Sequence, residues 1–175
     1  MSAVKHLAAL MDACGIPGLF CGGSARDTLL GRAPKDYDFV VYGDMEFADA
    51  RSKLDGSLFV VKHVYPKAYL PTQRFNWAIT VTFGYIDVDI IGWNTYPETP
   101  EDVVSNFDFD INACYFNEDH EAVALYPEAL KPGHLVQPLY RADLRMTRTE
   151  YLAQKFPQFN WSLALQVTKE KDPTL

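Results

Sequence analysis

The segment GGSARDTLLGRAPKDYDF (22–39) combines features that a purely structural loop does not need together. The apolar residues LFC (19–21) come directly before its two glycines and predict a short strand. Ser24 is the predicted N-cap of a helix over residues 25–30. The residues DYDFVVY (36–42) are β-branched and aromatic and predict a second strand. We therefore expect a strand, a glycine turn, a helix and a strand that carries two acids.

The two acids of this segment are Asp36 and Asp38, which we expect on one face of their strand because successive side chains alternate. Their α-carbons would lie about 6.6 Å apart, which is twice the rise per residue. Two carboxylates at that separation repel each other unless a cation lies between them. Mg²⁺ is bound by a few carboxylates together with water and substrate phosphates. The pair therefore indicates a magnesium site for phosphoryl transfer, with a solvated edge strand as the structural alternative.

The glycine turn is formed by Gly22, Gly23 and Ser24, between the first strand and the helix. Glycine lets the backbone approach a ligand closely, and N–H groups at a helix start favour phosphate oxygens. Many strand–helix turns use glycine only for geometry, so the turn alone is weak evidence for a ligand site. The acid pair that follows it strengthens this interpretation. We interpret the turn as the site of a triphosphate and the acidic strand as the site of its metal ions.

The rest of the chain predicts an α+β fold, in which helices flank a small mixed sheet. Gly84 marks a hairpin turn between two β-rich segments. We expect helices over 3–14, 45–54, 97–107 and 141–156, and strands over 57–65, 76–83, 85–91, 110–116 and 122–126.

The length and composition of the chain restrict the classes of protein to which it could belong. At 175 residues the chain is expected to form one domain, 1–175, without separate RNA-binding domains. Its net charge of −7 argues against a basic, non-specific nucleic-acid surface. No segment reaches the roughly 18 apolar residues of a membrane span, and no signal peptide is recognisable. Cys14, Cys21 and Cys114 lie among apolar neighbours, which favours buried, reduced thiols in a cytoplasmic protein.

The segment over residues 22–39 closely resembles the signature of the class II tRNA nucleotidyltransferases (CCA-adding enzymes) and bacterial poly(A) polymerases, in the polymerase-beta-like nucleotidyltransferase superfamily. That signature contains Gly-Gly, Arg-Asp, Leu-Gly and Lys-Asp-x-Asp at defined spacing. Every fixed position is present here: Gly22, Gly23, Arg26, Asp27, Leu30, Gly31, Lys35, Asp36 and Asp38. The resemblance covers about residues 19–155 and implies the polymerase-beta-like nucleotidyltransferase fold, corresponding to the catalytic head of these enzymes.

The resemblance also implies roles for the signature residues. Gly22, Gly23, Ser24 and Arg26 would hold the β- and γ-phosphates of a nucleoside triphosphate, and Lys35 would belong to the same nucleotide site. Asp27 would orient Arg26 or cap the helix rather than touch metal.

The superfamily uses a third carboxylate on a neighbouring strand. The segment YIDVDII (85–91) offers Asp87 and Asp89, which share one face of a strand. Asp89 is the first choice because the apolar residues after it indicate the buried central part of the strand. Asp87 remains the alternative.

Two further segments resemble family motifs. FDFDINACYF (107–116) is similar to Arg-Arg-Asp-Phe-Thr-Ile-Asn-Ala, and the resemblance places Asp108 and Asn112 beside the ribose. Asn106 and Phe107 stand where the family has arginines, which removes two positive charges near the triphosphate.

The segment RADLRMTRTEYLAQKF (141–156) looks like the Arg-x-x-Arg helix of the family. Arg141, Arg145 and Arg148 fall at helical spacing on one face and could meet phosphates. A solvated charged face is the alternative.

These features together predict a Mg²⁺-dependent nucleotidyltransferase that moves a nucleoside monophosphate from a nucleoside triphosphate to an acceptor hydroxyl. The resemblance favours an RNA 3′ end as acceptor, with specificity supplied by a partner protein. A protein or small-molecule hydroxyl is the enzymatic alternative. A nucleotide-binding regulatory module without turnover is the alternative from another class, and the absent arginines motivate it.

Overall fold

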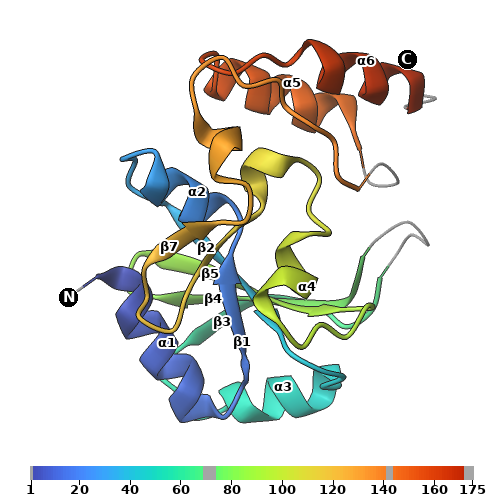
Figure 1. Ribbon diagram of the computed structural model, residues 1–175. Helices are drawn as coiled ribbons and strands as arrows, with labels where there is room; N and C mark the ends of the chain where they lie inside the picture. The colour runs from blue at the N-terminus through green and yellow to red at the C-terminus, as the bar shows by residue number, and fades with distance from the viewer. Residues whose placement is uncertain (1, 69–73, 141–143, 172–175) are drawn as a thin grey trace.

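The computed structural model describes residues 2–68, 74–140 and 144–171. In these residues, seven strands form one mixed sheet in the order β3-β4-β5-β2-β1-β6-β7 (Figure 1). Strands β2 and β5 run parallel, and the other neighbouring pairs are antiparallel. The strands are β1 (Gly18–Cys21), β2 (Asp36–Val41), β3 (Val60–Tyr65), β4 (Phe75–Phe83), β5 (Ile86–Trp93), β6 (Cys114–Phe116) and β7 (Ala122–Ala124).

Helices lie on both sides of this sheet, which confirms the predicted α+β class. The α-helices of the described residues are α1 (Ala3–Cys14), α2 (Gly23–Leu29), α3 (Phe47–Leu54), α4 (Pro100–Val104), α5 (Met146–Lys155) and α6 (Ser162–Lys171). The same part of the chain contains the 3₁₀ turns η1 (Asp110–Asn112) and η2 (Pro127–Leu130). None of the helices that the structure describes has the length and apolar character to cross a bilayer.

The main hydrophobic core lies between one face of the sheet and helices α1 and α3. Leu7 of α1 and Leu54 of α3 pack in the same cluster as Val88 and Ile90 of β5. Because side chains alternate along a strand, the burial of residues 88 and 90 turns residues 87 and 89 to the opposite face. The core therefore decides which way the acids of β5 point.

A second hydrophobic cluster joins α5 and α6 to the region of η1. Phe109 and Ile111 beside and within η1 pack with Leu152, Phe156 and Trp161. Figure 1 shows α5 and α6 side by side at the top of the view, on the side of the molecule where α2 lies. The C-terminal helix pair is therefore packed against the segment that resembles the family's sugar motif.

Three local predictions were wrong. The predicted strand over 110–116 begins with η1, because Asp110 accepts a hydrogen bond from the backbone N–H of Gln137 and pairs with His134, which bends the chain. The helix expected over 141–156 begins at Met146, and Arg145 is its extended N-cap. Residues 141–143 lie outside the described part of the chain. Helix α6 was not predicted from the sequence.

The third error concerns the cap of α2. Its N-cap is Gly22, not Ser24. Ser24 is buried inside the first turn, where its hydroxyl donates to the carbonyl oxygen of Cys21 at 3.4 Å. The hairpin turn at Gly84 is as predicted, since Phe83 pairs with Ile86.

Candidate active site

Four carboxylates gather on the sheet face opposite α1 and α3. In the parallel pair of β2 and β5, Asp36 lies level with Asp87, and Asp38 lies level with Asp89. Residues that lie level on neighbouring strands share a face, and such strands are about 4.8 Å apart. We call this group, Asp36, Asp38, Asp87 and Asp89, the acid face.

Two of these carboxylates have partners on the neighbouring strands. Thr80 of β4 donates its hydroxyl to Oδ1 of Asp89 at 2.6 Å. Lys62 of β3 places its Nζ 3.0 Å from Oδ2 of Asp87 in an exposed ion pair. Asp89 therefore has a neutral hydroxyl as its partner, whereas Asp87 is paired with the positive charge of a lysine.

The pKa of Asp38 reflects this concentration of charge. Burial is the largest cause that raises it, and the negative charge of Asp89 is the second. Arg148 acts in the opposite direction, and the result is a pKa of about 7 instead of 3.8. A cation near Asp38 would lower this raised pKa, because a positive charge stabilises the charged form of the carboxyl group.

The glycine turn lies directly beside the acid face. A Cβ atom placed on Gly22 would be 3.4 Å from Oδ2 of Asp38 and 3.6 Å from the ring of Phe107. Gly22 has φ +75° and ψ −136°, a conformation that only glycine adopts readily. Its N–H donates to the carbonyl oxygen of Cys114 at 2.8 Å. The turn is thus held between β1 and β6 with its backbone against Asp38.

Arg26 of α2 is buried, with 3% of the residue exposed. Its Nε and Nη2 donate to Oδ1 of Asp27 at 3.0 and 2.8 Å, and its Nη1 donates to the side-chain oxygen of Asn112. Its guanidinium also lies 4.4 Å from the ring centroid of Phe156. These contacts occupy the guanidinium inside the protein, which differs from the direct phosphate contact that the signature implied. Asp27 accepts two of these hydrogen bonds, which is the contact that an orienting role would need.

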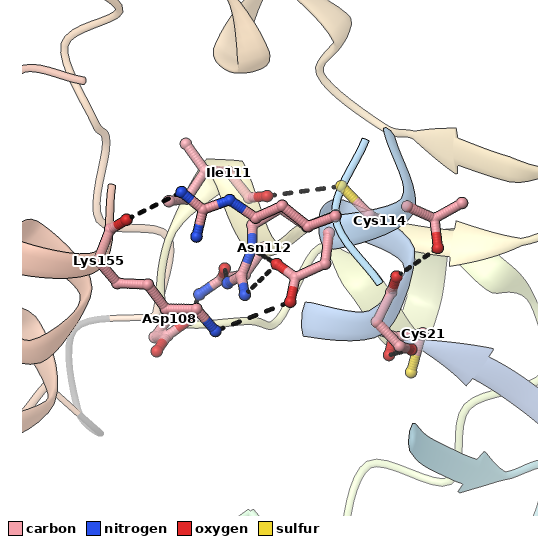
Figure 2. Close-up of polar contacts among 11 residues, drawn as sticks. Cys21, Asp108, Ile111, Asn112, Cys114 and Lys155 are labelled. Atoms are coloured by element: carbon pink, nitrogen blue, oxygen red, sulfur yellow. Dashed lines mark hydrogen bonds and ion pairs between the residues drawn. The ribbon is translucent and has the colours of Figure 1, made fainter. Parts of the chain in front are cut away.

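The hydrogen bonds continue from Arg26 to the C-terminal helix pair. Asn112 donates its Nδ2 to Oδ1 of Asp108 at 2.7 Å, and Arg148 of α5 lies 3.2 Å from Oδ2 of the same aspartate. Figure 2 shows Asp108 and Asn112 between Lys155 of α5 and the strand that begins at Cys114. Lys155 forms a second link, with its Nζ 3.7 Å from Oδ2 of Asp27.

A family model matches residues 9–134, which is more than half of the chain, and its description is Gad2, Gabija anti-defense 2 family protein. The chain belongs to the Gad2 family. The comparison with curated protein sequences returns no match for this Gad2 chain.

Solved structures similar to this Gad2 chain include tRNA nucleotidyltransferases. A tRNA-processing enzyme in an apo form has a TM-score of 0.64 and 20% identity, over 97% of this chain and 47% of its own. A CCA-adding enzyme in complex with CTP has a TM-score of 0.62 and 22% identity, over 97% and 43%. A tRNA nucleotidyltransferase complexed with a primer tRNA and an incoming ATP analog has a TM-score of 0.61 and 18% identity, over 94% and 49%.

These similarities confirm the nucleotidyltransferase fold that the signature predicted. The Gad2 chain spans less than half of the length of each of the three structures.

The basic residues expected at the nucleotide site lie in different settings in this Gad2 chain. Lys35 is exposed next to Asp36, at the start of β2. Arg148 reaches Asp108 and lowers the pKa of Asp38, so it faces the acid face. Arg145 is exposed and comes directly before α5 as its extended N-cap, whereas Arg148 lies within the helix. Arg141 lies outside the described residues.

The oxygen donors of the acid face suit a hard divalent cation in kind. Within the described residues, however, no three His, Cys, Asp or Glu side chains stand close enough together to hold a metal ion. The hydroxyl of Thr80 occupies one oxygen of Asp89. Mg²⁺ at this face would therefore take most of its ligands from water and substrate phosphates, as this ion commonly does.

Sequence reasoning missed Thr80, Lys62 and Phe156. Thr80 pairs with Asp89 across β4 and β5, so its place in the site depends on strand register, which no local motif encodes. Phe156 is an ordinary apolar residue in the sequence, and its importance comes from Arg26 and Arg32, whose guanidinium groups lie 4.4 and 4.7 Å from the centroid of its ring.

Proposed function

We propose that this chain is a Mg²⁺-dependent nucleotidyltransferase. It moves a nucleoside monophosphate from a nucleoside triphosphate to an acceptor hydroxyl and releases pyrophosphate. The observation that carries this proposal is the position of Asp36, Asp38 and Asp89 on one sheet face, with the backbone of Gly22 against Asp38. The nucleotidyltransferase fold of the chain supports it.

Asp36, Asp38 and Asp89 are the residues that would hold Mg²⁺. The ion, when bound, would neutralise their charge, polarise the α-phosphate and lower the pKa of the acceptor hydroxyl. We prefer Asp89 to Asp87 as the third carboxylate, because Asp89 lies level with Asp38 and Asp87 is paired with Lys62. Thr80 would orient Asp89 through its hydrogen bond.

The nucleotide would lie between the glycine turn and the C-terminal helix pair. The backbone at Gly22, Gly23 and Ser24 would border the β- and γ-phosphates, and Lys35 and Arg148 would supply positive charge. Asp108 and Asn112 would border the ribose. Arg26 is buried and engaged with Asp27 and Asn112, so we assign it the positioning of those residues instead of phosphate contact.

An RNA 3′ end is the acceptor we favour, since similar structures include a tRNA nucleotidyltransferase with a primer tRNA. The description of the Gad2 family as Gabija anti-defense supports a second candidate. We propose that nucleotidyl transfer serves this anti-defense role. A hydroxyl on a protein of the Gabija system is then the alternative acceptor, and a nucleotide-binding module without turnover is the alternative to catalysis.

The test is incubation of the purified protein with each α-labelled nucleoside triphosphate, Mg²⁺ and either pooled RNA or total protein. We expect label on one of the two pools, release of pyrophosphate, and loss of both after chelation of Mg²⁺ by EDTA. Asp36→Ala should reduce transfer at least 100-fold with an unchanged far-UV spectrum, because it removes one carboxylate of the proposed metal site. Glu150→Ala, at an exposed position of α5, is the matched control and should keep wild-type activity.

Two outcomes would contradict the proposal. Wild-type rates in Asp36→Ala would remove the acid face from the mechanism. Tight retention of a nucleotide without pyrophosphate release would favour the regulatory module.

A further inference from the structure

One row of residues crosses the sheet on the face that carries the acids. From β1 to β3, the strand register sets level Cys21, Asp38, Asp89, Thr80 and His63. Residues that lie level on neighbouring strands share a face, so the exposed His63 stands on the same side of the sheet as Asp89. With strands about 4.8 Å apart, the backbone of His63 lies roughly 10 Å from that of Asp89.

A bulge in β3 brings a lysine to the same side as this histidine. The pairing of β3 with β4 shifts between Val61 and His63, so Lys62 is the extra residue. Consecutive residues of a regular strand point to opposite faces, and a bulge re-aims one of them. Here the Nζ of Lys62 lies 3.0 Å from Oδ2 of Asp87, so both residues reach the side of the acids. We call Lys62 and His63 the β3 pair.

The charge of this surface changes sign across the sheet. Strands β2 and β5 carry the four aspartates of the acid face, and β4 follows with the uncharged side chains of Thr80 and Thr82. Strand β3 then presents the exposed β3 pair. Its lysine is positive, and its histidine donates a hydrogen bond in either tautomer and is positive when protonated. An anionic group is therefore attracted to β3, whereas the acid face without metal repels it.

The glycine turn lies at the other end of the row. Gly22 directly follows Cys21 of β1, and its backbone lies against Asp38. In phosphoryl transfer the attacking and leaving oxygens are roughly in line. The proposed function places the leaving pyrophosphate at the glycine turn, so the attacking hydroxyl comes from the side of β4 and β3. The β3 pair thus borders the side on which the acceptor lies.

We propose that the β3 pair binds a phosphate group of the acceptor, close to the hydroxyl that attacks. This inference rests on the proposed function and names its acceptor class: a nucleotide with a phosphate on the sugar that attacks, either free or at an RNA end. The hydroxyl oxygen forms a bond to the α-phosphorus, the bond from that phosphorus to pyrophosphate breaks, and the hydroxyl proton passes to water. Lys62 and His63 hold the acceptor and take no part in these bond changes.

The test measures the KM of three acceptors with a labelled nucleoside triphosphate and Mg²⁺. They are adenosine, the dinucleotide ApA, and a ten-nucleotide RNA that ends in adenosine. All three offer the same terminal hydroxyl groups, but adenosine has no phosphate. We expect the KM of adenosine to be at least tenfold above that of ApA. A still lower KM for the RNA would identify an RNA end as the source of the phosphate, and equal KM values for ApA and the RNA would identify a small nucleotide.

The double variant Lys62→Gln/His63→Gln removes the β3 pair. The matched control is Lys5→Gln/His6→Gln, because these residues are also consecutive and exposed but belong to α1, on the opposite side of the sheet. Only the first variant should raise the KM of ApA, by about tenfold, and it should leave the KM of adenosine and of the triphosphate unchanged. His63→Gln alone keeps the ion pair of Lys62 with Asp87 and should raise the KM of ApA about threefold.

The outcomes separate this inference from the proposed function. Absence of transfer to every acceptor, total protein included, would contradict the proposed function. Binding of the fluorescein-labelled RNA, measured by anisotropy without triphosphate, tests the β3 pair in that case too, and only Lys62→Gln/His63→Gln should weaken it about tenfold. Equal KM values for adenosine and ApA, transfer to protein alone, or equal effects of the two double variants would overturn the inference and leave nucleotidyl transfer intact.

Discussion

At the scale of single residues, each carboxylate of the acid face is defined by its neighbour. Lys62 compensates Asp87, and the hydroxyl of Thr80 orients Asp89. Asp38 has the negative charge of Asp89 nearby, and together with burial this raises its pKa. Four chemically identical side chains on one face therefore differ in charge and in freedom to bind a cation.

Thr80 offers a test of this arrangement. Thr80→Val keeps the shape of the side chain and removes the hydroxyl that holds Asp89. Because a metal ligand that loses its orienting hydrogen bond binds more weakly, we expect transfer to fall about tenfold and the Mg²⁺ requirement to rise. Initial rates measured against Mg²⁺ concentration give both quantities. Thr80→Ser should restore them, whereas a wild-type Mg²⁺ requirement in Thr80→Val would exclude the positioning role.

At the scale of elements, the C-terminal helix pair is joined to the signature helix by charge as well as by apolar packing. Lys155 and Arg148 of α5 reach Asp27 and Asp108. Between these two links, the fully buried ring of Phe156 lies against the guanidinium groups of Arg26 and Arg32. Residues of the signature therefore help to position α5. In turn, α5 helps to position these signature residues.

Phe156→Ala should destabilise the protein by about 3–5 kcal/mol, since it leaves a cavity in the second core and removes the ring beneath Arg26. The free energy of unfolding is measured by urea denaturation. Leucine at this position fills much of the same volume. Phe156→Leu should therefore lower the free energy of unfolding distinctly less than Phe156→Ala does. A loss below about 1 kcal/mol in the alanine variant would show that the helix pair does not depend on this contact.

At the scale of the whole molecule, the acid face makes stability depend on pH. The pKa of Asp38 is raised from 3.8 to about 7 in the folded protein, so the folded state binds this proton more tightly than the unfolded chain. Its contribution to stability is present below about pH 4 and is lost as the pH rises through about 7. Without metal, the charged form opposes folding at neutral pH.

We therefore expect Asp38→Asn to raise the melting temperature of the metal-free protein at pH 8 by roughly 3–10 °C. The gain should shrink at pH 5, because the wild-type carboxyl is then largely protonated. Mg²⁺ should stabilise the wild-type protein at pH 8 and have little effect on the variant. Thermal unfolding at both pH values, with and without Mg²⁺, measures these differences. An equal gain at pH 5 and pH 8 would contradict the assignment.

Local sequence determined much of the fold. Alternation placed Asp36 and Asp38 on one face, and periodicity predicted α1 with its observed bounds. The signature over residues 22–39 identified the nucleotidyltransferase fold, which the similar structures confirm. These features depend on short-range geometry, so the order of nearby residues is enough to predict them.

The tertiary structure alone decided how distant segments meet. Strand register set Asp89 level with Asp38 and brought Thr80 to it, and packing of α5 buried Arg26 against Phe156. Each depends on contacts between residues far apart in the chain. The free energy that stabilises such long-range contacts comes from the packing of the whole core. Short sequence patterns do not encode that packing.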